Sequence, residues 1–283
     1  MLLSNDGSNI ENTNISRYKT GRNEDRQMHT ITPRQQEIVR IAREQGRVDV
    51  EGLAGRFEVT PQTIRKDLND LCERGLLQRY HGGAVIASGV ANYGYDARRQ
   101  LATEEKRLIG IKAASLIPDN SSILINIGTT TEQVATALRH RHGLMVITNN
   151  TNVINILLGC AGIEVIVAGG VLRHSDGGVV GEAAVDFIRQ FKVDYAVIGT
   201  SAIDDDGSLL DYDYREVKVA KAILSCARQT ILVADSMKYA RTAPVRIGHI
   251  SEIDVFVTDK APPPALAAVC REHKIEIAIA EPA

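Results

Sequence analysis

Apolar positions near the N-terminus are spaced for three amphipathic helices followed by a hairpin. They recur every three or four positions over 33–45, 50–57 and 61–74, which is the period of one buried helix face. Strand-forming residues then flank Gly82–Gly83, a pair typical of a tight turn. Helices and hairpin in this order predict a winged helix-turn-helix domain over 29–86.

The rest of the chain alternates between strand-like and helical segments. Short apolar runs such as SILINIG, EVIVAGG and TILVADS are separated by longer amphipathic stretches such as EQVATALRHR and REVKVAKAILSCA. This alternation is typical of a mostly parallel sheet covered by helices. We therefore expect an α/β domain over 107–283.

Two segments have neither pattern. Residues 1–28 are polar and charged, with too few apolar residues to offset the entropy cost of ordering. They predict a disordered tail. Residues 87–106 are irregular and polar, and predict a linker between the two domains.

Composition and targeting signals exclude several classes of protein. The chain is 44% hydrophobic and 24% charged with a formal net charge of -2, which is ordinary for a globular protein and shows no overall attraction to polyanions. The four cysteines form no CxxC pair and no histidine stands at zinc-ligand spacing, so we expect reduced thiols and no metal. Without a signal peptide or a membrane-length apolar run, the expected location is the cytoplasm, with no membrane partner.

The third predicted helix has a polar face opposite its apolar stripe. Arginine can bind guanine through two hydrogen bonds, and glutamine or asparagine can bind adenine in the same way. Residues at the hairpin tip can contact phosphate or the minor groove. The candidate DNA-binding residues are Gln62, Thr63, Arg65, Lys66, Asn69, Arg79, Tyr80 and His81.

An ordinary solvated surface helix has the same kind of polar face, and basic and acidic residues are nearly balanced over 29–90. Charge therefore does not decide between the two interpretations. The complete order of helix, turn, helix and wing favours binding to double-stranded operator DNA.

Small and hydroxylated residues follow several predicted strands. The carboxyl ends of parallel strands meet at one edge of a sheet, where helix N-termini favour anions. Each turn alone is equally typical of simple packing, but together they predict a phosphate site with Lys238 as its best cation. Acidic residues there, Asp213 among them, suit polyol hydroxyls. The candidate effector-binding residues are Asn126, Gly128, Thr129, Thr130, Thr131, Asn149, Asn150, Gly169, Gly170, Gly199, Thr200, Ser201, Asp204, Glu216, Asp235 and Lys238.

Specific motifs occur in both parts of the chain. The first part contains VTPQTIRKDLNDL and RYHGGA, and the second contains NIGTTTEQVATAL, GTSAIDDDGSLLDYDYREV and VADSMKYAR. From Gln35 to the C-terminus the chain thus resembles the DeoR family of bacterial sugar-metabolism repressors. The resemblance implies that Gln62 to Asn69 enter the major groove and that the protein acts as a homo-oligomer, a dimer or tetramer, on repeated half-sites.

The same resemblance implies a large domain similar to ribose-phosphate isomerases and coenzyme A transferases, without their catalysis. It also implies a phosphorylated sugar or polyol as effector, with sn-glycerol 3-phosphate as the inducer. Two positions depart from the family pattern, which usually has an aspartate at Asn126 and a basic residue at Ala220. An amide in place of the carboxylate removes an acceptor for ligand hydroxyls.

Two other functions compete with this one. A sugar-phosphate isomerase needs a carboxylate base beside the phosphate, for which Glu216 or Asp235 is available, but the fused head and Asn126 count against it. A DNA-binding protein without any ligand is disfavoured by the several candidate ligand turns. We therefore expect a repressor of carbohydrate or polyol catabolism genes, with no catalytic residues, no metal and no cofactor.

Overall fold

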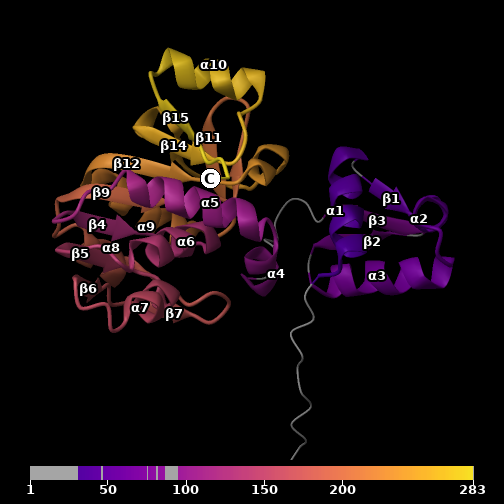
Figure 1. Ribbon diagram of the computed structural model, residues 1–283, viewed down its shortest axis with the longest axis horizontal. Coiled ribbons are helices and arrows are strands. Elements are labelled where there is room, and N and C mark those ends of the chain that lie inside the picture. Colours follow the sequence, from indigo (N-terminus) through magenta and orange to yellow (C-terminus); the bar gives the residue numbers. More distant parts are fainter. Residues whose placement is uncertain (1–30, 46, 75, 81, 87–94, 283) are drawn as a thin grey trace, which may run out of the picture. The chain divides into compact units, whose positions relative to one another are not determined.

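The computed structural model describes residues 31–45, 47–74, 76–80, 82–86 and 95–282 (Figure 1). The predicted tail over 1–28 and the candidate His81 lie outside these residues. Among the described helices, none is both long enough and apolar enough to span a bilayer.

The N-terminal part is a small helical unit with an antiparallel sheet, as the winged helix-turn-helix prediction requires. The wing strands β2 and β3 form the predicted hairpin, and a third strand, β1, pairs with β3 to give the order β1-β3-β2. This third strand was not predicted, because three residues are too few to show a period. The elements are α1 (Pro33–Gln45), β1 (Arg47–Asp49), α2 (Val50–Phe57), α3 (Pro61–Glu73), β2 (Leu77–Tyr80) and β3 (Gly83–Ile86).

The apolar stripes of the three helices meet in the core of this unit, where Ile38, Ile64 and Leu68 are fully buried. Side-chain caps fix where α2 and α3 begin. Asp49 accepts a hydrogen bond from the Gly52 amide at 2.7 Å, and Thr60 accepts one from the Thr63 amide at 3.2 Å.

The segment expected to be an irregular linker contains two helices in its described part. These are α4 (Tyr95–Gln100) and α5 (Thr103–Ser115). Tertiary contacts explain why the local pattern did not reveal α4. The Tyr95 hydroxyl donates to Glu132 at 2.7 Å, and the buried ammonium of Lys106 donates to the carbonyl oxygens of Arg98 and Leu101.

The C-terminal part contains the predicted parallel sheet. Seven strands pair in the order β15-β14-β12-β9-β4-β5-β6, and every pairing is parallel. The chain adds strands outward from β4 to β6 and then returns to the other side of β4 with β9. The strands are β4 (Ser122–Ile125), β5 (Leu144–Thr148), β6 (Ile163–Val167), β9 (Val193–Ile198), β12 (Ala227–Val233), β14 (Val255–Thr258) and β15 (Glu276–Ile279).

Alternating strand residues build a separate apolar core on each face of the sheet. Ile123, Ile125 and Val197 pack with helices α5, α6 (Thr129–Leu138) and α7 (Thr151–Leu157). Their neighbours Leu124 and Ala196 pack on the opposite face with α8 (Glu182–Ile188), α9 (Tyr214–Ser225) and α10 (Pro264–Glu272). Figure 1 shows this layered arrangement. Because the strands are buried on both faces, they appear in the sequence as continuous apolar runs.

Shorter elements surround the carboxyl ends of the strands. Strands β7 and β8 form a hairpin, and β10, β11 and β13 form a second, antiparallel sheet of order β10-β11-β13. In the sequence, these strands lie between the strands of the main sheet. These elements are β7 (Val171–Arg173), β8 (Gly178–Val180), β10 (Ala202–Ile203), β11 (Ser208–Asp211), β13 (Val245–His249) and the 3-10 helices η1 (Ser236–Ala240) and η2 (Ile250–Glu252).

Helices α5 and α6 approach closely at Gly110. A Cβ atom built there would lie 2.6 Å from the carbonyl carbon of Gln133, where backbone cannot give way easily. Gly110→Ala should therefore lower the free energy of unfolding by about 1–3 kcal/mol through overpacking. Urea denaturation followed by circular dichroism measures this.

The matched control is Gly55→Ala in α2, where an added Cβ would meet nothing within 4 Å. At this helical position alanine should be neutral or stabilising, by roughly 0.5–1 kcal/mol. A Gly110→Ala protein as stable as the parent would contradict the close packing of α5 on α6.

Candidate functional site

The polar face predicted for the third helix is present on α3. Ile64, Leu68 and Leu71 are buried, whereas the opposite side of the helix faces solvent. Thr63 is half-buried and its hydroxyl lies 2.9 Å from that of Thr60, so it contributes to the start of the helix. The exposed candidates on α3 are Gln62, Arg65, Lys66 and Asn69.

The two arginines among the DNA candidates are exposed and weakly engaged. Arg65 lies 3.7 Å from the exposed carboxylate of Glu51, an ion pair of the kind that contributes little to stability. Arg79 on β2 donates to the carbonyl oxygen of Gly83 at 3.3 Å. Tyr80 ends β2, and its side chain is not among the described ones.

A buried polar network holds α3 against α1. The Asp67 carboxylate, 6% exposed, accepts from the Arg34 guanidinium at 2.6 Å and from the Gln35 amide at 3.3 Å. Gln35 also donates to Asp70 at 2.8 Å. The hydrogen bond to Asp67 raises the pKa of Arg34, which indicates a charge-assisted contact. This network orients the exposed face of α3 relative to the rest of the unit.

Asp67→Ala should lower the free energy of unfolding of the N-terminal unit by about 1–3 kcal/mol, because it leaves Gln35 and Arg34 without a shared acceptor. Glu51→Ala removes an exposed carboxylate from the same unit and should change stability by less than about 0.5 kcal/mol. Thermal unfolding of both variants measures the difference. Equal melting temperatures would show that the network does not hold α3.

A cavity opens where strand order reverses between β4 and β9. Crossovers leave these two strands in opposite directions, which creates a crevice at their carboxyl ends. About 380 Å³ of space, part of it open to solvent, lies between the residues that line this cavity. It is lined by Arg98, Ile127, Gly128, Thr129, Thr130, Thr131, Gly199, Thr200, Ser201, Asp211, Glu216, Val233 and Lys238.

The turn from β4 into α6 forms one wall of this cavity. Gly128 has φ +150°, a conformation that favours glycine, and the first turn of α6 follows it directly. The first N–H groups of a helix have no acceptor within the helix and carry partial positive charge. The Thr131 hydroxyl donates to the Asn126 and Gly128 carbonyls at 2.8 Å and so stabilises the turn itself. This wall is suited to an anion.

Side chains of both charges complete the cavity. Desolvation, together with Arg241, holds the pKa of Lys238 well below its usual value, so an anion placed beside it would favour its protonation. Ser201 donates to the buried carboxylate of Asp211 at 3.0 Å. Burial raises the pKa of Glu216 to about 8, and Asp211 adds to this shift.

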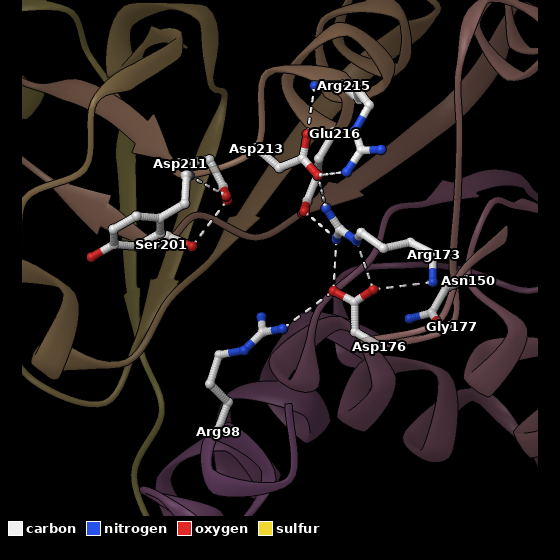
Figure 2. A network of polar contacts seen from close by, with 12 residues as sticks. Arg98, Asn150, Arg173, Asp176, Gly177, Ser201, Asp211, Asp213, Arg215 and Glu216 are labelled. Atoms are coloured by element: carbon white, nitrogen blue, oxygen red, sulfur yellow. Dashed lines mark hydrogen bonds and ion pairs between the residues drawn. The ribbon is translucent and has the colours of Figure 1, made fainter. Parts of the chain in front are cut away.

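Arg173 connects these groups to the β7–β8 hairpin (Figure 2). Its guanidinium contacts Glu216 at 2.5 Å, Asp213 at 3.0 Å and both oxygens of Asp176, at 2.6 and 2.8 Å. Asp213 in turn accepts from Arg215 at 2.7 Å. These contacts fix the position of Glu216 at the edge of the cavity.

The other predicted effector residues do not line this cavity. Asn126 and Asn149 directly follow β4 and β5 with buried side chains, and within the described residues their Oδ1 atoms have no hydrogen-bond partner. Asn150 donates to Glu132 at 3.1 Å and accepts from the Asn152 amide. Asp235 begins η1 by accepting from the Met237 amide at 3.2 Å.

The glycine pair after β6 and the acidic turn after β10 also lie elsewhere. Gly169 and Gly170 are exposed in a turn that packs on the hairpin, since a Cβ at Gly170 would lie 2.8 Å from the Val180 carbonyl oxygen. Asp204 belongs to the tight β10–β11 turn, where its carbonyl oxygen accepts from Gly207 at 2.9 Å. Ala220, a position of departure from the family pattern, is fully buried in an apolar core.

Sequence analysis missed Arg98 and Asp211 at the cavity, and Arg173 and Asp176 behind it. Arg98 fell in the segment expected to be irregular. Asp211 could have been found, since it ends a strand-like run in SLLDYDY. Pairing between Arg173 and residues some forty positions away has no local signal. Over the described ranges, no cluster of histidine, cysteine or acidic residues is arranged to hold a metal ion.

The raised pKa of Glu216 makes stability depend on pH in a defined direction. Between its usual pKa near 4.5 and about 8, the folded chain binds a proton at this site that the unfolded chain has lost. The free energy of unfolding should therefore fall as pH rises over this window. In Glu216→Gln that contribution is absent, so its stability relative to the parent should increase with pH, by roughly 1 kcal/mol per pH unit at most.

Urea unfolding at pH 5, 6, 7 and 8 measures this difference. Glu182→Gln is the control, because Glu182 pairs with Lys218 on the surface and its pKa is lowered by that contact. A Glu216→Gln protein whose pH profile runs parallel to the parent would contradict a protonated Glu216.

Comparison with known proteins gives consistent matches over most of the chain. Residues 34–90 match the DeoR-like helix-turn-helix domain, and residues 101–260 match the DeoR C terminal sensor domain. The chain is 44% identical over 246 residues to the glycerol-3-phosphate regulon repressor of Escherichia coli, covering 87% of this chain and 98% of that protein. It is 45% identical to the repressor of the same name from Haemophilus influenzae, covering 81% and 89%.

Among solved structures, the chain matches ribose 5-phosphate isomerase from Plasmodium falciparum with a TM-score of 0.35 and 17% identity, covering 47% of this chain and 52% of that one. It matches eIF2B beta from Chaetomium thermophilum with a TM-score of 0.43 and 18% identity, covering 60% and 54%. Similarity at this level says nothing about activity.

Proposed function

Because the chain belongs to the DeoR family of transcriptional repressors, we propose that it represses glycerol phosphate or related polyol catabolism genes and that sn-glycerol 3-phosphate induces them. The N-terminal unit binds operator DNA, and the C-terminal domain binds the inducer. The names of the E. coli and H. influenzae relatives support this choice of inducer.

The exposed face of α3 supports the DNA-binding role. Gln62, Arg65, Lys66 and Asn69 present donors suited to base edges, and the Asp67 network holds the helix that carries them. We propose that α3 enters the major groove and that Arg79 on β2 reaches phosphate or the minor groove, the role that the sequence also predicts for Tyr80 and His81.

The observation that carries the sensor role is the cavity at the switch between β4 and β9. The first turn of α6, Arg98 and Lys238 offer donors and positive charge for a phosphate. Asp211 and Ser201 offer acceptors for hydroxyl groups on the same ligand. A small phosphorylated polyol combines both kinds of group.

We infer that the chain is a regulator rather than an isomerase, without catalytic residues. A proton-transfer base must be ionised and free to reach the substrate. Glu216 is held by the Arg173 guanidinium, and Asp235 accepts from a backbone amide at the start of η1. Neither arrangement favours a base, and the amide of Asn126 cannot replace one.

We propose that the protein works in the cytoplasm, where operator DNA lies, as a homo-oligomer on paired half-sites. A dimer or tetramer matches the repeated half-sites that such units read. Inducer binding favours an arrangement whose paired units fit the half-site spacing less well. Operator affinity then falls by the coupling free energy, typically about 1–3 kcal/mol.

Operator release tests the proposal. Full-length protein bound to DNA from its own upstream region should be released by sn-glycerol 3-phosphate at lower concentrations than by other sugar phosphates. Lys238→Met should raise the concentration needed at least tenfold, because it removes the amine that an anion in the cavity would protonate and pair with, while affinity for DNA without inducer stays the same. Fluorescence anisotropy of labelled operator measures both.

Lys218→Met is the matched control, since Lys218 is exposed and pairs with Glu182 outside the cavity. It should respond as the parent does. If only another sugar phosphate released the operator, the proposed inducer would be wrong but the repressor function would stand. If the protein did not bind the operator at all, the repressor function would be wrong.

A further inference from the structure

Helix α4 is the first described element after the DNA-binding unit ends at β3, and hydrogen bonds from side chains hold it to the sensor domain. The Tyr95 hydroxyl at its start donates to the buried carboxylate of Glu132 at 2.7 Å. At its end, the buried ammonium of Lys106 donates to the carbonyl oxygens of Arg98 and Leu101. These hydrogen bonds hold both ends of α4 in place.

Arg98 is the residue of α4 that reaches the cavity. Its side chain is 15% exposed, it lines the cavity opposite Ser201 and Asp211, and its Nη2 contacts Asp176 at 3.2 Å (Figure 2). Among the described residues, its buried Nε atom has no hydrogen-bond partner. A buried guanidinium with an unsatisfied donor is incompletely stabilised in this arrangement.

Asp176 does not depend on Arg98. Arg173 already contacts both of its carboxylate oxygens, at 2.8 and 2.6 Å, and the Gly178 amide donates to it at 3.3 Å. The contact with Arg98 is longer than either contact with Arg173. If an anion entered the cavity, Arg98 could leave Asp176 while that carboxylate stayed paired.

We propose that Arg98 is an effector ligand that connects the occupied cavity to α4: the phosphate group of the effector takes the Arg98 guanidinium from Asp176. This inference rests on the proposed function, since it assigns a residue to the same cavity. Arginine is suited to the exchange because its planar fork binds carboxylate and phosphate with the same geometry. Arg98 lies on α4, which follows the DNA-binding unit in the sequence. Loss of the contact between Arg98 and Asp176 therefore changes how α4 is attached to the sensor domain.

Binding of sn-glycerol 3-phosphate to full-length protein, measured by isothermal titration calorimetry, tests the ligand role. Arg98→Ala should raise the Kd about tenfold to a hundredfold, the effect of losing a charge-assisted hydrogen bond. Arg107→Ala is the matched control, because Arg107 is an exposed arginine on α5 that pairs with Glu104. It should bind as the parent does. An Arg98→Ala protein with the parent Kd would overturn the assignment.

Tyr95→Phe tests the connection without changing any residue of the cavity. It removes the hydrogen bond to Glu132 that holds the start of α4. Because Tyr95 does not line the cavity, inducer should bind within about threefold of the parent Kd. The ratio of operator affinities without and with saturating inducer should fall at least threefold toward one, which reports coupling rather than binding. A parent-like ratio in Tyr95→Phe would overturn the role of α4.

The operator-release and inducer-binding measurements distinguish the proposed function from the assignment of Arg98. If neither sn-glycerol 3-phosphate nor any other phosphorylated polyol releases the parent protein from DNA, the proposed function is wrong. If the parent is released and Arg98→Ala binds and responds in the same way, only the assignment of Arg98 is wrong.

Discussion

Parallel strands can be joined only by crossovers that pass over a face of the sheet, and here the crossovers leave β4 and β9 in opposite directions. Both faces are therefore covered by helices, and each core is built from alternate residues of the same strands. Among the described residues, these crossovers leave a crevice at the carboxyl ends of β4 and β9. The cavity, its α6 wall and its access to charged groups all follow from this reversal.

The acidic and basic side chains around the cavity differ in how completely they are paired. Arg173 holds Glu216, Asp213 and Asp176 together, and this cluster gives the site a defined shape. Lys238 and Arg98 are less completely paired, since burial lowers the pKa of Lys238 and Arg98 keeps an unpartnered Nε within the described residues. Removing charges from water without full compensation is costly. A phosphate that pairs with these two side chains removes part of this penalty, and this favours its binding.

The DNA-binding unit follows a different logic, in which stability and recognition use opposite sides of one helix. Apolar residues and the Asp67 network fix α3 from beneath, and Gln62, Arg65, Lys66 and Asn69 are exposed on its other side. Exposed side chains of this kind are accessible to DNA. Changes on the buried side should therefore affect folding, whereas changes on the exposed side should affect binding alone.

The sequence by itself determined the helices of the DNA-binding unit, the exposed face of α3 and the parallel α/β class, because helical and strand periods are local properties. It also identified the β4–α6 turn, the end of β9 and Lys238, since small and charged residues after buried strands have few local roles. Only the tertiary structure separated these from Gly169, Gly170 and Asp204, which lie in other turns. It alone brought Arg98, Arg173 and Asp176 together, because ion pairs between distant segments leave no periodic trace and a six-residue helix is stabilised by its contacts.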